Sequence, residues 1–167
     1  MKETSNFCPC KSGLAFTECC LPFIQAHETT IKNEMSLTPP TPEKLMRSRY
    51  CAYAIQNYHY IINTYTASKA KSLSINVIEN DCQHTQWLNL QIIHSSESTE
   101  KGEVEFVAFY KDKGEFFCMH ERSLFIKELG QWKYHTGKVL DKTGKLKPER
   151  NKLCLCGSGK KFKRCCC

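Results

Sequence analysis

Two groups of four closely spaced cysteines lie at opposite ends of this chain of 167 residues. They belong to the segments CPCKSGLAFTECC (8–20) and CLCGSGKKFKRCC (154–166). Four thiols in so short a segment can converge on one ion as a tetrahedral thiolate cage, the usual arrangement of structural zinc in proteins. The spacing therefore predicts two structural zinc ions. Their eight predicted ligands are Cys8, Cys10, Cys19, Cys20, Cys154, Cys156, Cys165 and Cys166.

Disulfides and iron are the alternatives to zinc at these cysteines. The Cα atoms of adjacent residues such as Cys19 and Cys20 lie about 3.8 Å apart, below the roughly 4.4 Å minimum of ordinary disulfides. These two thiols therefore do not pair readily with each other, although cross-links to Cys8 and Cys10 stay open. Four thiolates also hold iron or an iron–sulfur cluster, but adjacent ligating cysteines favour one small ion. Metal is the favoured interpretation, and zinc is the favoured metal.

The two cysteine segments are copies of one repeat, here called the N-terminal knuckle (8–20) and the C-terminal knuckle (154–166). Seven of thirteen positions are identical, which gives the pattern C-x-C-x-S-G-x-x-F-x-x-C-C. The shared glycine lets the backbone turn through conformations closed to other residues, and the shared phenylalanine can cover the metal and exclude water. So short a segment has no core of its own, and we expect removal of the metal to unfold both ends.

Positive charge is concentrated at the C-terminal end. Residues 142–167 hold nine Lys or Arg residues and one acid, a charge of +8, whereas the other 141 residues sum to −1. A basic rim on a zinc knuckle suits an acidic protein surface or a phosphate backbone, and a merely solvated tail is the alternative. The predicted partner-binding residues are Lys160, Lys161, Lys163 and Arg164.

The composition, 41% hydrophobic and 25% charged, is typical of a folded globular protein. No apolar run is long enough to cross a bilayer core of about 30 Å. The start of the chain also lacks the continuous apolar stretch of a secretory signal. We therefore expect no membrane partner and a cytoplasmic location, and the sequence indicates no oligomeric state.

The first half of the middle region has a helical pattern. Thr41 followed by Pro42 indicates a helix start. Apolar residues then recur at helical spacing over about twenty residues, with a break near Asn57. A shorter helix is predicted over 67–79.

The second half has a strand pattern. Strands are predicted from Thr85 onward and over 103–111, 115–128 and 131–136. Alternation with a period of two divides the side chains of the first strand between two faces. One face should carry Leu88, Leu90 and Ile92, and the other Trp87, Asn89 and Gln91. Helices followed by an antiparallel meander predict the α+β class.

The C-terminal knuckle resembles the SEC-C motif, a small zinc-binding element also found at the C-terminus of the preprotein translocase ATPase SecA, where it contacts a chaperone and ribosomes. Every ligand position of the motif is present in both knuckles. Leu155 replaces a usual proline, and Lys11 stands where glycine is usual. Neither departure removes a ligand, so the resemblance implies one zinc ion at each end.

Over nearly its whole length the chain resembles the YchJ family of bacterial SEC-C proteins, which has no established activity. The segments that carry this resemblance are LMRSRYCAY (45–53), TQWLNL (85–90), HERSLF (120–125) and QWKYHTG (131–137). It implies a central domain like nuclear transport factor 2, in which a curved antiparallel sheet packs on helices and leaves a cone-shaped pocket. Thr66 stands where the family often has a histidine. We expect a knuckle domain at 1–24, a linker at 25–42, the central α+β domain at 43–140 and the basic knuckle domain at 141–167.

His120, Glu121 and Ser123 are the strongest catalytic candidates in the sequence. They lie on one predicted strand, where a period of two places Glu121 and Ser123 on one face and His120 on the other. The three residues therefore cannot form a triad by themselves, and we predict no catalytic residue.

A pocket under the predicted sheet has a second set of candidates. Side chains from the helix and the strands could converge there, and a buried ion pair packed by aromatic rings is the alternative. The predicted pocket residues are Arg47, Tyr50, Glu121, Trp132 and Tyr134. Cys51, Cys82 and Cys118 are expected to be buried apolar thiols, and Cys167 a spare terminal thiol.

We expect a zinc-dependent interaction protein rather than an enzyme. Its C-terminal knuckle would dock on an acidic protein, chaperone or ribosomal surface, while the central pocket binds a peptide or small ligand. One alternative is an enzyme that uses the central pocket, which requires a deep polar cavity containing Arg47 or Glu121. The other is nucleic-acid binding through the basic tail, which requires an affinity that falls steeply with salt.

Overall fold

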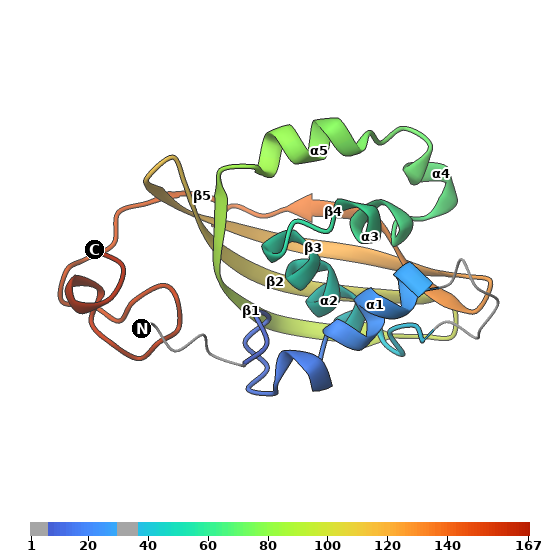
Figure 1. Cartoon of the computed structure of the whole chain (residues 1–167), viewed down its shortest axis with the longest axis horizontal. Helices are drawn as coiled ribbons and strands as arrows, with labels where there is room; N and C mark the ends of the chain where they lie inside the picture. Colours follow the sequence, from blue (N-terminus) through green and yellow to red (C-terminus); the bar gives the residue numbers. More distant parts are fainter. Residues whose placement is uncertain (1–6, 30–36) are drawn as a thin grey trace.

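A computed structural model describes residues 7–29 and 37–167 of the chain. A curved antiparallel sheet wraps around helix α2, and the other helices lie beside it (Figure 1). The predicted α+β class is confirmed. The α-helices of the described residues are α1 (Leu21–Thr29), α2 (Pro42–Ala54), α3 (Tyr58–Asn63), α4 (Ala67–Ala70) and α5 (Ile75–Cys82). Each knuckle contains one short 3-10 turn, η1 (Phe16–Glu18) or η3 (Phe162–Arg164).

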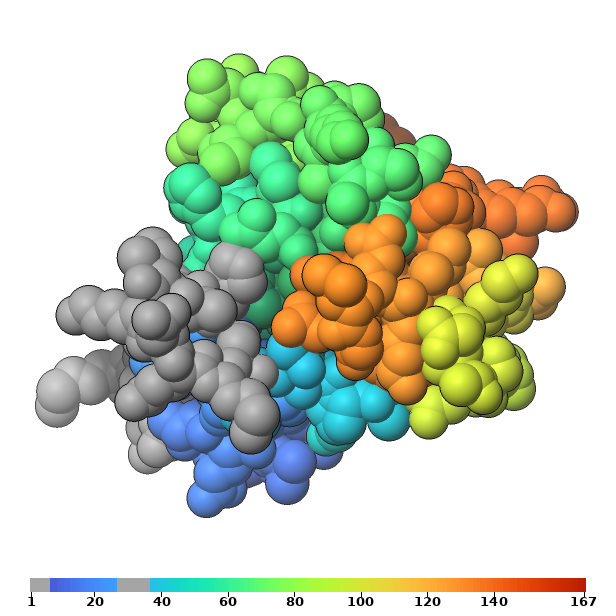
Figure 2. Space-filling view, turned by 90° about the vertical axis from the view of Figure 1, so that its right-hand side faces the viewer, coloured from blue at the N-terminus to red at the C-terminus, as the bar shows by residue number. Residues whose placement is uncertain are grey.

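The sheet of the described residues has five strands, and four of them follow one another as a meander in the order β1-β2-β3-β4. Their bounds are β1 (Thr85–Glu97), β2 (Lys101–Asp112), β3 (Glu115–Glu128) and β4 (Gln131–Val139). The fifth strand, β5 (Gly144–Leu146), pairs with the first half of β3, whose second half pairs with β4. The predicted meander is confirmed, whereas β5 has no counterpart among the predicted strands. Turns of the sheet are exposed at the end of the molecule shown in Figure 2, next to residues 37–41.

Helix α2 begins where the sequence predicts. Thr41 caps it, because its side-chain oxygen accepts a hydrogen bond from the Lys44 backbone N–H at 3.2 Å. The predicted break near Asn57 is also confirmed, since α2 ends at Ala54 and Asn57 caps α3. The single helix predicted over 67–79 is wrong, because two short helices, α4 and α5, replace it.

A serine explains this interruption. The Ser72 hydroxyl, two residues after the end of α4, donates to the Lys69 carbonyl at 2.9 Å. Serine side chains that bond the backbone in this way compete with helix continuation. The helical pattern resumes only at Ile75, where α5 starts.

Strand β1 departs from simple alternation because of a β-bulge. Its pairing with β2 skips Leu88, which has no partner between the pairs of Trp87 and Asn89. A bulge places two consecutive residues on the same side of the sheet. Leu88 and Asn89 accordingly both lie against the C-terminal knuckle, while Trp87 and Leu90 pack on the helical side. The predicted common face of Leu88 and Leu90 is therefore wrong.

The main hydrophobic core lies between α2 and the concave face of the sheet. Its fully buried members include Leu45 and Ile61 from the helices and Val104, Phe106 and Phe125 from the strands. A second, smaller cluster joins the opposite face of the sheet to the C-terminal knuckle. Within the described part of the chain, no helix combines the length and apolar character that a bilayer span requires.

The elements do not stop at the predicted domain boundaries. Helix α1 continues to Thr29, past the predicted end of the first knuckle domain at 24, and residues 30–36 of the predicted linker lie outside the described residues. Strand β5 belongs to the central sheet although it follows the predicted boundary at 140.

Candidate metal centres and central cavity

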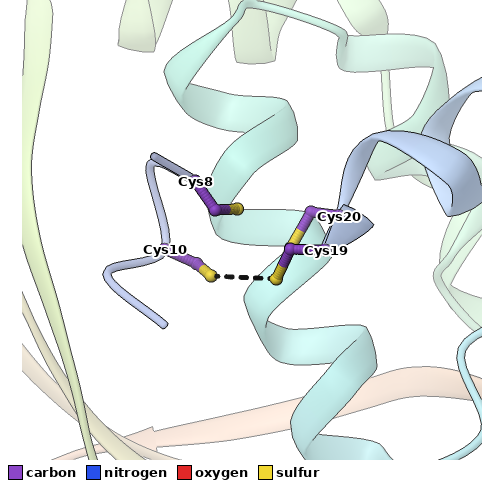
Figure 3. Close-up of side chains that lie close together, drawn as sticks. All are labelled: Cys8, Cys10, Cys19 and Cys20. Atoms are coloured by element: carbon purple, nitrogen blue, oxygen red, sulfur yellow. Dashed lines mark hydrogen bonds between the residues drawn. The ribbon is translucent and has the colours of Figure 1, made fainter. Parts of the chain in front are cut away.

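The four cysteines of the N-terminal knuckle face one another (Figure 3). Their sulfur atoms all lie within 4.8 Å of one another, and each residue is at most 4% exposed. The Cys8 N–H donates to the Leu14 carbonyl at 2.8 Å, which folds the segment back on itself. Lys11 holds the left-handed turn at φ 59°, and its counterpart Gly157 holds the same turn at φ 73°. The departure from glycine at Lys11 thus leaves the turn intact.

The C-terminal knuckle repeats this geometry. Its four cysteine sulfurs also lie within 4.8 Å of one another. The Cys154 N–H donates to the Lys160 carbonyl at 2.8 Å, as Cys8 does to Leu14 in the first copy. The hydroxyls of Ser12 and Ser158 each lie 3.2 Å from the third cysteine sulfur of their own knuckle. The internal repeat predicted from sequence is therefore a structural repeat as well.

The two knuckles differ in how deeply they are buried. All four cysteines of the first are buried, whereas in the second Cys154 is buried, Cys156 and Cys166 are half-buried and Cys165 is exposed. The second knuckle is attached to the sheet by Phe162, whose ring meets that of Phe116 at 5.2 Å in an edge-to-face contact. Cys167 is exposed and lies outside the cluster.

Helix α2 anchors the N-terminal knuckle. The Cys51 sulfur lies 3.4 Å from that of Cys8, and Arg47 Nη1 donates to the Cys10 carbonyl at 3.2 Å. Arg47 also pairs with Glu43 at 2.8 Å. The prediction that Arg47 lines the pocket is wrong, because positions 47 and 51 share the helix face that meets the knuckle. Cys51 is fully buried, as predicted.

Electrostatics favours a cation at both clusters. The neighbouring thiols, Cys20 first and then Cys51, stabilise the thiolate of Cys10 and lower its pKa, and the proximity of Cys10 raises the pKa of Cys20. Burial raises the pKa of Cys156, but hydrogen bonds from Ser158 and Cys165 outweigh it and lower that pKa to about 6. One thiolate in a cluster thus keeps its neighbours protonated. Four thiolates together need a soft divalent cation, and the donor set is compatible with zinc.

A cavity of about 240 Å³ lies between α2 and the concave face of the sheet. Its aromatic walls are formed by Tyr50, Tyr53, Tyr65, Trp87, Phe106 and Tyr134. Of the predicted pocket residues, Tyr50, Glu121 and Tyr134 line this cavity. Trp132 does not, because its indole N–H donates to the Pro40 carbonyl at 3.1 Å on another side of the core. Cys82, predicted as buried, is half-buried and also lines the cavity.

Arg49 is the charged residue among the cavity residues that were not predicted from the sequence. It is 3% exposed, and its Nη1 donates to the Ile61 carbonyl at 2.9 Å and to the Thr64 hydroxyl at 2.6 Å. The guanidinium lies 4.4 Å from the ring centre of Tyr65 and 4.6 Å from that of Tyr134. The available signal was helical spacing, because positions 46, 49, 50 and 53 share one face of α2 and all line the cavity.

Glu121 lies on the cavity wall formed by the sheet. Its Oε1 accepts hydrogen bonds from the Ser123 hydroxyl at 2.6 Å and the Tyr134 hydroxyl at 2.9 Å. The backbone of Gly137 lies so close that a Cβ there would overlap the Glu121 carboxylate. Burial and the nearby Glu121 charge raise the pKa of Tyr134, so its hydroxyl stays protonated and keeps donating.

His120 lies on the opposite face of β3, as the predicted alternation requires. Its Nε2 is 2.9 Å from Glu105 Oε1, and Arg122 Nη2 is 2.7 Å from the other oxygen of the same carboxylate. The predicted separation of His120 from Glu121 and Ser123 is confirmed, and the three do not form a triad. Cys118 is buried on this strand, as predicted.

The four basic residues of the C-terminal knuckle are all exposed. Within the described residues none of them forms an ion pair. These residues are Lys160, Lys161, Lys163 and Arg164.

Comparison with known proteins adds family descriptions to this geometry. Residues 41–137 match the family described as YchJ, middle NTF2-like domain, and residues 150–166 match the SEC-C motif. A UPF0225 protein of Actinobacillus succinogenes is 39% identical over 161 residues, which cover 95% of this chain and 95% of the relative. A UPF0225 protein of Shewanella sp. (strain MR-4) is also 39% identical, over 95% of this chain and 94% of the relative.

Two solved structures have the same architecture. The solution structure of a SEC-C motif protein from Rhodopseudomonas palustris is 32% identical with a TM-score of 0.71, and the match covers 80% of this chain and 98% of that one. The crystal structure of a SEC-C motif protein from Psychrobacter arcticus is 27% identical with a TM-score of 0.68, over 99% of this chain and 98% of that one. Because sequence and fold agree along nearly the whole chain, this protein belongs to the YchJ family of SEC-C motif proteins, with a central domain like nuclear transport factor 2.

Proposed function

We propose that each knuckle holds one structural Zn²⁺ and that the chain is a cytoplasmic zinc-dependent interaction protein. Its C-terminal knuckle docks on an acidic protein, chaperone or ribosomal surface, and its central cavity holds a ligand. Four cysteine thiolates fill the tetrahedral coordination of zinc, so the ions organise the knuckles and leave no open position for a reactant.

A comparison of the two knuckles carries this proposal. They share one backbone arrangement, yet Lys160, Lys161, Lys163 and Arg164 of the second occupy the positions of Leu14, Ala15, Thr17 and Glu18 in the first. The first copy closes the same turn without these charges, so positive charge is not needed to form the knuckle. Exposed charge that is not required for folding is available for a partner, and it suits a negative surface.

The experiment for the partner site is a charge reversal with a matched control. Lys160→Glu, Lys161→Glu and Lys163→Glu are combined in one full-length variant, and the control combines Lys69→Glu, Lys71→Glu and Lys113→Glu. All six side chains are exposed, and the two variants have the same net charge. Affinity capture from bacterial lysate and co-sedimentation with ribosomes are measured with both.

We expect the knuckle variant to lose partners that the control variant keeps. If both variants keep the same partners, the proposed docking site is wrong. If the partner is still captured after ribonuclease treatment, it is a protein. A loss on that treatment, with affinity that falls steeply between low and high salt, assigns it to the nucleic-acid alternative.

The metal assignment has its own measurement. Elemental mass spectrometry of protein purified without added metal should find close to two zinc ions per chain. Iron, or oxidised thiols without metal, would overturn the zinc proposal.

A further inference from the structure

The central cavity contains the buried, positively charged guanidinium of Arg49. Among the described residues, no carboxylate lies within ion-pair distance of the Arg49 guanidinium. Its recorded hydrogen bonds are both made by Nη1, so the donors on Nε and Nη2 stay available. Trp87 lines the same cavity, and its buried indole N–H has no partner within the described part of the chain.

Leaving such groups unpaired is unfavourable. A buried donor without an acceptor costs about 1–3 kcal/mol, and an unpaired buried charge costs more. The ring faces of Tyr65 and Tyr134 partly stabilise the guanidinium, because a cation–π interaction away from water contributes about 2 kcal/mol. Neither ring supplies the anionic acceptor that a planar guanidinium binds best, which is a carboxylate with two oxygens.

The rest of the cavity restricts what can accompany that carboxylate. The walls are aromatic, and the volume of about 240 Å³ is smaller than the roughly 300–1,000 Å³ of pockets for drug-sized ligands. Such a space suits a molecule with a single ring. Glu121 faces the cavity from the sheet, and among the recorded hydrogen bonds only its Oε1 is used. Its second oxygen can accept from a hydroxyl of the ligand.

We propose that the cavity binds a small monocyclic aromatic carboxylic acid, with its carboxylate on Arg49 and its ring against Tyr50, Trp87 and Phe106. A hydroxyl on the far side of the ring donates to Glu121. This proposal names the ligand class of the proposed function, and it rests on that function only in that the central domain binds a ligand. Several residues of the cavity wall are only half-buried, among them Tyr53, Tyr65 and Cys82.

The test compares acids with neutral analogues of the same shape. Zinc-loaded full-length protein is titrated with para-hydroxybenzoate, benzoate and phenylacetate, and with the carboxamide of each, by calorimetry and ligand-observed NMR. We expect the best acid to bind at least about tenfold more tightly than its amide, since only the acid neutralises the guanidinium. Removing the hydroxyl should weaken binding further, because Glu121 then loses its donor.

Two arginines on one helix provide a matched pair of variants. Arg49→Gln should reduce the affinity for the acid at least about tenfold while the affinity for the amide stays the same. Arg47→Gln, two residues earlier and facing the knuckle, should change neither. A loss of near-ultraviolet circular dichroism in Arg49→Gln would mean that this variant does not fold. The proposal is then tested by comparing the affinities for acid and amide in the natural protein and in Glu121→Gln.

Three results would overturn the proposal: equal affinity for acid and amide, no binding of any probe below about 1 mM, or an equal effect of the two arginine variants. Zinc content and the charge-reversal capture are measured on the same preparations. If the protein lacks zinc or the charge reversal changes no partner, but the acid still binds, only the proposed function of the knuckles is refuted. If zinc and partner capture are as expected but no acid binds, only the proposed cavity ligand is refuted.

Discussion

The unequal burial of the two knuckles predicts that a chelator removes zinc from them at very different rates. In the C-terminal knuckle, exposed Cys165 and half-buried Cys156 and Cys166 let a chelator reach the ligands while the knuckle stays docked. In the N-terminal knuckle all four cysteines are buried against α2, so the knuckle must first detach. The free energy of that opening sets the difference in rate.

The structure gives the size of this opening step. Helix α1 follows the knuckle directly and contacts both η1 and α2, so a detachment that carries α1 along exposes Ile24, whose burial contributes about 1.5–3 kcal/mol. It also breaks the hydrogen bond from Arg47 to the Cys10 carbonyl, and a bond with a charged donor contributes about 1.5–3 kcal/mol. The sum of about 3–6 kcal/mol corresponds to a release that is slower by a factor of about 10² to 10⁴.

A chromogenic pyridylazo chelator in excess, followed by stopped-flow absorbance, measures both rates in one experiment. We expect zinc release in two phases of equal amplitude, each corresponding to one zinc ion. The rate of the slow phase should be lower than that of the fast phase by a factor of about 10² to 10⁴. Cys165→Ser should abolish the fast phase, and Arg47→Ala should accelerate the slow phase about tenfold or more, because opening then costs one hydrogen bond less. A single phase that releases both ions, or a slow phase assigned to the C-terminal knuckle, would refute the reasoning from burial.

Three further predictions concern packing, capping and thiol reactivity. Gly137→Ala should lower the free energy of unfolding by about 1–3 kcal/mol, because the added Cβ overlaps the Glu121 carboxylate. The control, Lys138→Ala at the exposed neighbouring position, should leave that free energy nearly unchanged. Urea denaturation compares the two variants, and equal stabilities would contradict this packing. Thr41→Ala should cost about 0.5–2 kcal/mol in the same assay through loss of the α2 cap, and no change would show that this cap is not stabilising. Because removal of the metal is expected to unfold the C-terminal knuckle, the hydrogen bonds from Ser158 and Cys165 that lower the pKa of Cys156 to about 6 are lost, and alkylation of Cys156 in metal-free protein should have its midpoint near the ordinary thiol pKa of about 8.5. Peptide mass spectrometry measures alkylation at this site against pH, and a midpoint near pH 6 would show that the knuckle keeps its fold without metal.

Local features of the sequence predicted local features of the structure well. The Thr41–Pro42 helix start and the break at Asn57 depend on side chains that form hydrogen bonds with the backbone a few residues away. Both can therefore be predicted from the sequence without knowledge of the fold. The cysteine repeat can be predicted for the same reason, because its cysteines, glycine and serine act within thirteen residues. The strand meander followed from alternation and turn residues, and only the short β5 escaped, since three residues are too few to show a period.

The cavity was harder to predict because it depends on which way helix α2 faces. Arg47 and Arg49 are equally plausible in the sequence, and two residues on a helix point in nearly opposite directions. Docking of the N-terminal knuckle on the face that contains Arg47 and Cys51 turns Arg49 toward the sheet. The bulge at Leu88 had a similar effect, because it brought Trp87 to the cavity side against the simple alternation.

The sequence by itself thus determined the α+β order of elements, the two cysteine cages and the concentration of charge at one end, since each is set by residue type and short-range spacing. Only the tertiary structure decided which arginine is buried without an ion pair to any described residue, how Glu121 and Tyr134 meet on the sheet wall of the cavity, and why one knuckle is buried while its copy is partly exposed. These properties arise where segments far apart in the chain pack together, and the burial and pairing of a side chain there depend on neighbours that no local pattern specifies.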